Sequence, residues 1–226
     1  MKSKYLNLSL VFCIVLGSLL SAYPALADDP IPTIDFWNYP YDPSIFDWIA
    51  FGLYDTAPPE WVCHWDFGDG TTYDECWVDS AKQYNQDGDY TVNVVITSSE
   101  TEIYNGSRIV SVRTHDVAIT KFTVPQSARV GQTRQLVVNV RNIRYSENVQ
   151  VMLYRNEDVD PFGTLTLNVP IRLANRTTAF NFNYTFTAED AHNGKVTFRA
   201  VAILMDVRDA WPVDNEAISL PSRVTR

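Results

Sequence analysis

The sequence has little positive charge and few of the residues on which metal and nucleophilic sites depend. Only 18 Lys and Arg residues stand against 27 Asp and Glu, which gives a net charge of −9 at pH 7. A chain this acidic repels phosphate backbones, so we expect no nucleic-acid partner. His64, His115 and His192 are the only histidines, and none lies in an H-E-x-x-H spacing. These absences predict no metal site built on histidine.

Catalytic signatures are missing as well. The sequence contains no G-x-S-x-G nucleophile elbow, no P-loop and no dinucleotide-binding fingerprint. Carboxylates are plentiful, so a pair suited to glycoside hydrolysis stays open, although the sequence favours no particular pair. We therefore expect a protein that is not an enzyme and has no cofactor.

Helical periodicity is absent too, because no long segment repeats apolar residues at i, i+3, i+4 and i+7. Apolar and polar residues alternate instead. The alternation predicts strands over 90–96, 108–112, 117–122, 135–140, 149–154, 179–186 and 195–204, and it places Phe180, Phe182, Tyr184 and Phe186 on one face. Short strands separated by turn residues predict an all-β chain of two tandem immunoglobulin-like β-sandwiches. The pattern restarts near His115, so we place a boundary between Arg113 and Asp116.

The N-terminus predicts export. Lys2 and Lys4 precede an apolar run from Leu10 to Leu20, and Ala25-Leu26-Ala27 follows. This arrangement is typical of a secretory signal peptide, which we assign to residues 1–27 with cleavage after Ala27. Nothing later is apolar enough to span a membrane. We therefore expect a secreted or cell-surface protein whose mature chain has no transmembrane segment.

Two cysteines remain after the predicted cleavage, in a compartment that lets disulfides persist. Cys63 lies six residues before Asp69-Gly70 and Cys76 lies six residues after it. Asp-Gly favours a tight hairpin turn, and a turn centred on this pair would bring the two cysteines face to face. The pair lacks a C-x-x-C spacing, which argues against redox or metal chemistry. The sequence predicts a structural, cross-strand disulfide.

The same turn contains the most specific string of the chain, Trp65-Asp66-Phe67-Gly68-Asp69-Gly70. Alternation directs Trp65 and Phe67 into a core. Gly68 and Gly70 permit positive φ, and the Asp69 side chain can bond the amides of the turn. Further along the chain come Tyr84, Gly88, Tyr90 and Val92.

This combination resembles the polycystic kidney disease (PKD) domain, an immunoglobulin-like sandwich common in secreted and surface proteins of bacteria and archaea. The resemblance assigns residues 28–114 to such a domain. The family often has His two residues before the first Tyr, where this chain has Lys82. We expect the exchange to remove one buried hydrogen-bonding group without changing the fold.

Residues 115–226 resemble CARDB-type or related immunoglobulin-like domains of bacterial surface proteins. The cues are Asp116-Val117-Ala118-Ile119, Gly131 before a Val-rich strand, Val140-Arg141-Asn142, and Val213-Asp214-Asn215. The resemblance implies a second sandwich.

Aromatic residues gather between Phe36 and Tyr54. If residues 45–53 formed one strand, Ile45, Ile49, Phe51 and Leu53 would share one face and Phe46 and Trp48 the other. Since a sandwich strand has one inward face, the second set would be exposed, or covered by the neighbouring domain or by the Pro-rich segment that precedes it. Exposed aromatics stack on sugars or anchor interfaces. The candidate ligand-binding residues are Trp37, Phe46 and Trp48.

Calcium is the one metal that the resemblance suggests, because some PKD domains bind it through acidic residues near their start. Asp28, Asp29 and Asp35 could do so here. Asn85, Asp87 and Asp89 alternate around Gly88, but Tyr90 and Ile96 stand where a calcium loop needs Gly and an acidic residue. We interpret Gly88-Asp89 as a turn before a strand.

The resemblances imply a non-catalytic extracellular or cell-surface protein for adhesion, envelope binding or spacing, with a surface protein or polysaccharide as its partner. A carbohydrate-binding module that uses the aromatics of the first domain is the alternative hypothesis. A secreted hydrolase with an unfamiliar site is a third.

Overall fold

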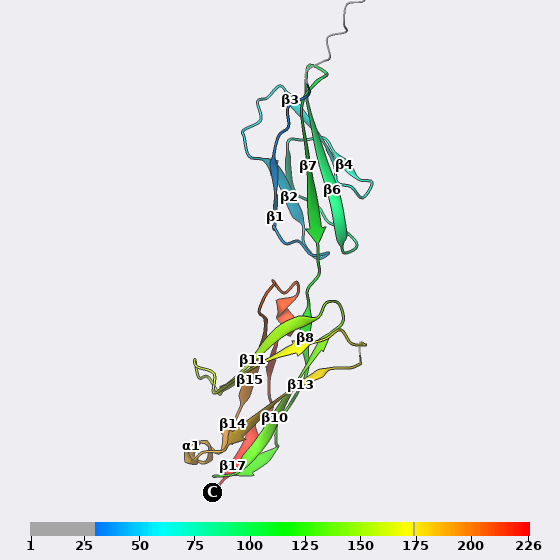
Figure 1. Cartoon of the computed structure of the whole chain (residues 1–226). Coiled ribbons are helices and arrows are strands. Elements are labelled where there is room, and N and C mark those ends of the chain that lie inside the picture. Colours follow the sequence, from blue (N-terminus) through cyan, green and yellow to red (C-terminus); the bar gives the residue numbers. More distant parts are fainter. Residues whose placement is uncertain (1–29, 174) are drawn as a thin grey trace, which may run out of the picture. The chain divides into compact units, whose positions relative to one another are not determined.

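The computed structural model describes residues 30–173 and 175–226, without the side chains of Ser80 and Ala81. The predicted signal peptide, Asp28 and Asp29 lie outside the described residues. Strands dominate the described chain, which confirms the all-β prediction (Figure 1). No helix within the described ranges has the length and apolar character needed to cross a membrane.

The N-terminal sandwich consists of a three-stranded and a four-stranded sheet (Figure 1). The first sheet has the order β1 (Phe36–Tyr39), β2 (Ile49–Leu53) and β5 (Trp77–Lys82). The second has the order β4 (Thr72–Tyr73), β3 (Trp61–Asp66), β6 (Gly88–Ser98) and β7 (Thr101–Val112). All of these strands pair antiparallel, as hairpin-connected strands do.

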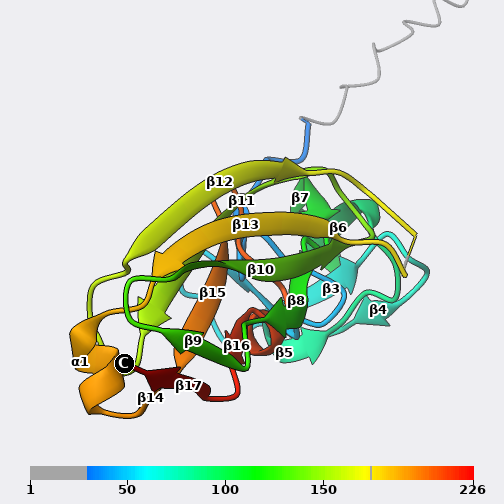
Figure 2. The same cartoon turned by 90° about the horizontal axis from the view of Figure 1, so that it is seen from below.

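The C-terminal sandwich has two main sheets and a small third one (Figure 2). One main sheet has the order β13 (Thr178–Thr185), β10 (Thr133–Asn142) and β8 (Val117–Thr123). The other has the order β12 (Gly163–Val169), β11 (Glu147–Arg155), β15 (Phe198–Leu204) and β16 (Glu216–Ile218). The small sheet joins β14 (Lys195–Val196), β17 (Ser222–Thr225) and β9 (Ser127–Arg129).

Two short helices were not expected from the sequence: α1 (Ala188–His192) and the 3-10 turn η1 (Pro212–Asp214). The α1 turn begins at Thr187, whose side chain accepts the Asp190 amide, while the Asp190 carboxylate accepts the Thr187 amide. This reciprocal pair is a capping box. A five-residue helix is too short to show a period of 3.6, so the apolar pattern could not reveal it.

Each sandwich has its own hydrophobic core. One cluster runs from Phe36 to Val112 and the other from Val117 to Val224. The four aromatic residues expected on one face of β13 and beyond it are all buried in the second cluster: Phe180, Phe182, Tyr184 and Phe186. The boundary that the sequence places between residues 114 and 115 stays a prediction.

The structure confirms the Cys63–Cys76 disulfide but corrects the predicted hairpin. Trp65 faces Tyr73 and Asp66 faces Thr72, so the turn centres on Asp69 alone. The cause is a three-residue loop, closed by the Phe67 amide donating to the Thr71 carbonyl at 3.1 Å. Since β4 ends at Tyr73, Cys76 lies beyond it, in the segment that leads into β5. The disulfide therefore ties β3 to the entry of a strand in the other sheet.

The two glycines of this loop adopt positive φ, 72° at Gly68 and 87° at Gly70. A Cβ on Gly68 would lie 2.5 Å from the Thr91 carbonyl oxygen, so the loop passes β6 too closely for any side chain there. Asp66 accepts the Gly68 amide at 2.9 Å, and Asp69 accepts the Thr71 amide at 3.2 Å. These local bonds fix the conformation of the turn.

Tyrosines pack beneath the same turn. The buried Tyr84 hydroxyl donates to the Phe67 carbonyl at 2.9 Å, and burial raises the pKa of Tyr84. The Tyr90 ring stacks on Tyr84 with 3.9 Å between centroids. Val92 is buried beside them and Gly88 begins β6. The Trp65 indole donates to the Glu75 carbonyl at 2.8 Å.

Lys82 corrects a second expectation, because it does not remove a buried hydrogen-bonding group but supplies one. Its side chain is only 6% exposed, and its ammonium donates to the Asp69 carboxylate and, at 2.7 Å, to the Thr71 hydroxyl. The ammonium also lies 4.5 Å from the Tyr84 ring centroid. Burial would raise the pKa of Asp69, but the bonds from Lys82 and Thr71 outweigh burial and hold it below its usual value.

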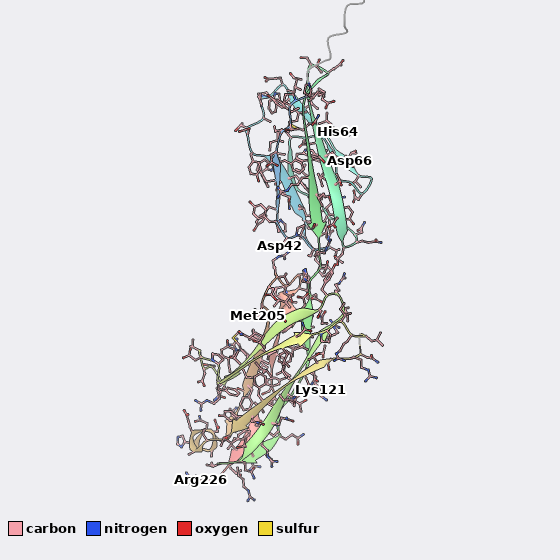
Figure 3. All side chains as sticks on the ribbon, in the orientation of Figure 1. Asp42, His64, Asp66, Lys121, Met205 and Arg226 are labelled. Atoms are coloured by element: carbon pink, nitrogen blue, oxygen red, sulfur yellow. A yellow bond between two sulfur atoms is a disulfide. The ribbon has the colours of Figure 1, made fainter. Side chains whose placement is uncertain are left out.

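We predict that Lys82→Met lowers the free energy of unfolding by about 2–4 kcal/mol, because it leaves the Asp69 carboxylate largely buried without its cation. Chemical denaturation measures the change. Lys121→Met is the matched control, since Lys121 is exposed on β8 of the other sandwich (Figure 3). Equal, small effects of the two substitutions would contradict a structural role for the buried ammonium.

Candidate binding site

The outward face of the β1-β2-β5 sheet carries two tryptophans beside a glycine. Trp37 on β1 faces Gly52 on β2, and Gly52 faces Trp77 on β5. Their strand neighbours Phe36, Phe51 and Val78 point inward and are buried. Because side chains alternate along a strand, this core packing directs both indoles outward.

Gly52 makes room for the Trp37 ring to lie across the sheet. A Cβ at Gly52 would lie 2.6 Å from Trp37 Cζ2, closer than two carbon atoms can approach. Trp37 Nε1 donates to the Leu53 carbonyl at 3.2 Å, which fixes the ring. The Trp37 and Trp77 rings meet at 72° with 5.1 Å between centroids, an edge-to-face contact. Trp77 remains 56% exposed.

A hollow of about 420 Å³ opens next to this indole pair. Aromatic and small side chains line most of it, and Asp55 and Thr56 supply the polar groups. The lining residues are Trp37, Leu53, Tyr54, Asp55, Thr56, Ala57, Cys76 and Trp77. No Lys, Arg or His is among the described residues that line it. The hollow thus combines exposed ring faces with a hydrogen-bond-accepting carboxylate.

The disulfide positions one wall of this hollow. Cys63 is fully buried in the core, and Cys76 is bonded to it and directly precedes Trp77. The covalent tie limits movement of the segment that presents the Trp77 ring. A wall fixed before a ligand arrives reduces the entropy that binding would cost.

Of the three candidate residues from the sequence, the structure brings only Trp37 to the hollow. The expected strand over residues 45–53 begins at Ile49, because a turn occupies Ser44–Asp47. The Asp47 carboxylate accepts the Ser44 amide at 2.7 Å and the Ser44 hydroxyl at 2.6 Å. Phe46 and Trp48 lie in and just after this turn, 45% and 59% exposed, and do not line the hollow.

The sequence did not reveal Trp77 or Gly52, and Tyr54 was counted in the aromatic cluster but not among the candidate ligand-binding residues. One signal could have identified Trp77: it precedes the apolar Val78 in a strand, so alternation would have directed Val78 into the core and Trp77 outward. Gly52 carried no signal, because the contact that requires it is with a ring on another strand.

The acidic residues considered for calcium that lie within the described ranges have separate partners. Asp35 Oδ1 accepts the amide of Phe36 at 2.8 Å. Asp87 accepts the Thr114 hydroxyl at 2.6 Å, while Asp89 is bonded to Ser111 and Arg113. Within the described ranges, no three His, Cys, Asp or Glu side chains are arranged to hold a metal ion.

The histidines lie apart as well. His64 is exposed on β3, where its Nδ1 pairs with Asp74 (Figure 3). His115 Nδ1 lies 2.6 Å from the Glu147 carboxylate, and His192 ends α1.

Burial raises the pKa of two carboxyl groups of the second sandwich, Asp116 and Asp214. Burial, followed by the negative charges of Asp214 and Asp209, raises the pKa of Asp116 to about 6. Arg141 and Arg144 oppose the shift without cancelling it. Asp116 Oδ1 is buried and has no hydrogen-bond partner among the described residues, so no hydrogen bond to this atom offsets the cost of burying its charge.

Comparisons with known proteins give no family assignment. No protein-family model and no curated protein matches this sequence. Among solved structures, the chain is similar to the CARDB domain of the PF1109 protein of Pyrococcus furiosus in complex with di-metal ions. That match has 17% identity and a TM-score of 0.39, and it covers 50% of this chain and 90% of that one.

Two further solved structures are similar over longer stretches. One belongs to carbohydrate-binding modules from the β-sandwich superfamily, with 13% identity, a TM-score of 0.32, and 88% and 99% of the two chains covered. The other is a chimeric titin Z1Z2 tandem, with 14% identity, a TM-score of 0.25, and 86% and 92% covered. All three TM-scores are low, so the PKD and CARDB resemblances stay predictions.

We predict that Asp116→Asn raises the free energy of unfolding at pH 7 by about 1–2 kcal/mol, after allowance for solvent screening. A carboxyl group whose pKa is raised in the folded state stabilises the fold below its unfolded pKa of 3.8, and that stability is lost as pH rises through about 6. The advantage of the variant should therefore shrink between pH 7 and pH 4.5.

Chemical denaturation at both pH values measures this effect. Asp160→Asn, at an exposed carboxylate of the same sandwich, is the control and should show no such pH dependence. An Asp116→Asn variant less stable than the parent at pH 7 would contradict the claim that the ionised Asp116 carboxylate destabilises the folded state.

Proposed function

We propose that this chain is a non-catalytic extracellular protein that attaches to an envelope or matrix by binding glycans through its first sandwich. The observation that carries the proposal is the indole pair of the half-buried Trp37 and the exposed Trp77, which lies across Gly52 beside the hollow. Planar aromatic faces stack on the apolar CH faces of sugar rings, and an ordered ring loses little entropy when it does so.

The polar groups of the hollow favour binding over cleavage. Hydrolysis of a glycoside typically needs two carboxyl groups on opposite sides of the scissile bond. Asp55 is the one carboxyl group among the described lining residues. A sugar in this hollow would therefore meet a hydrogen-bond acceptor and stacking surfaces but no acid–base pair.

An extracellular location is supported by the predicted signal peptide and by the Cys63–Cys76 disulfide. Structural disulfides persist in exported proteins and are rare in reducing cytosol.

Adhesion to a surface protein is the second candidate function. Tyr39 and Tyr41 are 65% and 72% exposed, with 6.2 Å between their ring centroids. Exposed tyrosines are enriched in protein interfaces, where they combine apolar area with a hydroxyl group.

The test is retention of the secreted chain on insoluble polysaccharides and on the host's envelope fraction. We predict that Trp77→Ala lowers retention on polysaccharide about two- to twelvefold, since one aromatic stacking contact contributes about 0.5–1.5 kcal/mol. Trp48→Ala is the matched control, because Trp48 is 59% exposed and lies outside the hollow. It should bind as the parent does.

Three outcomes separate the hypotheses. Loss in the Trp77 variant alone supports glycan binding at the hollow. Equal retention of both variants on polysaccharide contradicts the site, and binding confined to envelope protein, removed by Tyr39→Ala, supports adhesion instead.

A further inference from the structure

We infer that the hollow beside Trp77 selects uncharged sugars and excludes acidic ones such as uronic acids. This inference rests on the proposed function, and it narrows the ligand of that same site. The selectivity depends on the negative charge of Asp55 in the lining and on the lack of a cationic side chain among the described lining residues.

Two ring faces and one acceptor define what fits. Trp77 and Tyr54 are 56% and 62% exposed, while Trp37 is half-buried and held by its bond to the Leu53 carbonyl. A volume of about 420 Å³ lies within the ~300–1,000 Å³ typical of small-molecule sites. The geometry suits a sugar whose CH face meets an indole while its hydroxyl groups reach Asp55 and Thr56.

The charge of the lining sets the selectivity. A carboxylate accepts hydrogen bonds and donates none, so the Asp55 side chain would pair with the hydroxyl groups of a sugar. No cationic side chain among the described lining residues could pair with a carboxylate on the ligand. A uronic acid in the hollow would lose hydration and face a like charge at short range.

The charge of the whole chain acts in the same direction. With 27 acidic and 18 basic residues, the protein repels anionic ligands before contact. Repulsion by the net charge acts over long distances and weakens as salt is added. Repulsion between Asp55 and a ligand carboxylate held within a Debye length is screened less. Salt dependence can therefore separate the two.

The test uses the full secreted chain and two matched ligand pairs. The probes are cellotetraose and mannotetraose, each compared with its counterpart oxidised to the uronate at C6. Isothermal titration at 20 mM and 300 mM NaCl measures the four affinities. We expect each neutral probe that binds to bind at least tenfold more tightly than its uronate at both salt concentrations.

Asp55→Asn isolates the charge, because amide and carboxylate have nearly the same shape and residue 55 is exposed. The variant should reduce the ratio of neutral to uronate affinity at least fivefold, and this ratio is the readout because the loss of the charged acceptor also weakens binding of the neutral sugar. Glu60→Gln makes the same charge change on an exposed residue outside the hollow. It should leave the ratio unchanged.

Gly52→Ala tests the geometry independently. Its Cβ would displace the Trp37 ring, so binding of the neutral probe should fall at least fivefold without loss of any aromatic residue. Thermal unfolding and the far-UV spectrum report whether this variant folds, and the Asp55 variant decides the inference if it does not.

The outcomes distinguish the inference from the proposed function. Binding that needs Trp77 but shows no preference, or the same preference in Asp55→Asn, overturns the charge selectivity and leaves glycan binding standing. Tighter binding of a uronate than of its neutral counterpart also overturns the selectivity. Binding of no probe and of no insoluble polysaccharide overturns both.

Discussion

Strand alternation in a two-sheet sandwich governs the rest of this structure. Each strand has one face that a core can bury, so Phe36, Phe51 and Val78 leave their neighbours on the outside. In the β1-β2-β5 sheet those neighbours are Trp37, Gly52 and Trp77. The candidate site is therefore a direct product of the core, and its indoles cannot turn inward without displacing buried side chains.

The first sandwich adds two constraints that fix this outer face. The Cys63–Cys76 disulfide connects the core to the residue before Trp77, and the Lys82 ammonium binds the β3–β4 turn from the end of the same strand β5. Both constraints tie β5 to β3, across the two sheets. A binding surface on β5 is thereby held on a rigid element, as precise recognition requires.

The fold class and most long strands could be predicted because alternation extends over five or more residues, as in β6, β10 and β13. The disulfide could be predicted from the spacing of the cysteines. The predicted register of the hairpin was wrong by one residue, because the loop consists of Gly68-Asp69-Gly70 and not of Asp69-Gly70 alone. The expected strand wrongly included Phe46 and Trp48, because the alternation of apolar residues does not reveal the turn over Ser44–Asp47. The sequence could not predict that Trp77 and Gly52 lie side by side. Their position depends on the register between β2 and β5, and no local sequence pattern specifies that register.

The most direct test of this account is the ¹H–¹⁵N spectrum of the tryptophan indoles during titration with a neutral oligosaccharide retained by the protein. The chain has six tryptophans, and single substitutions assign their indole signals. We expect the signals of Trp37 and Trp77 to shift together and saturate with one affinity, while those of Trp48 and Trp211 stay in place. Shifts confined to Trp48 or Trp211, with Trp37 and Trp77 unchanged, would contradict the site.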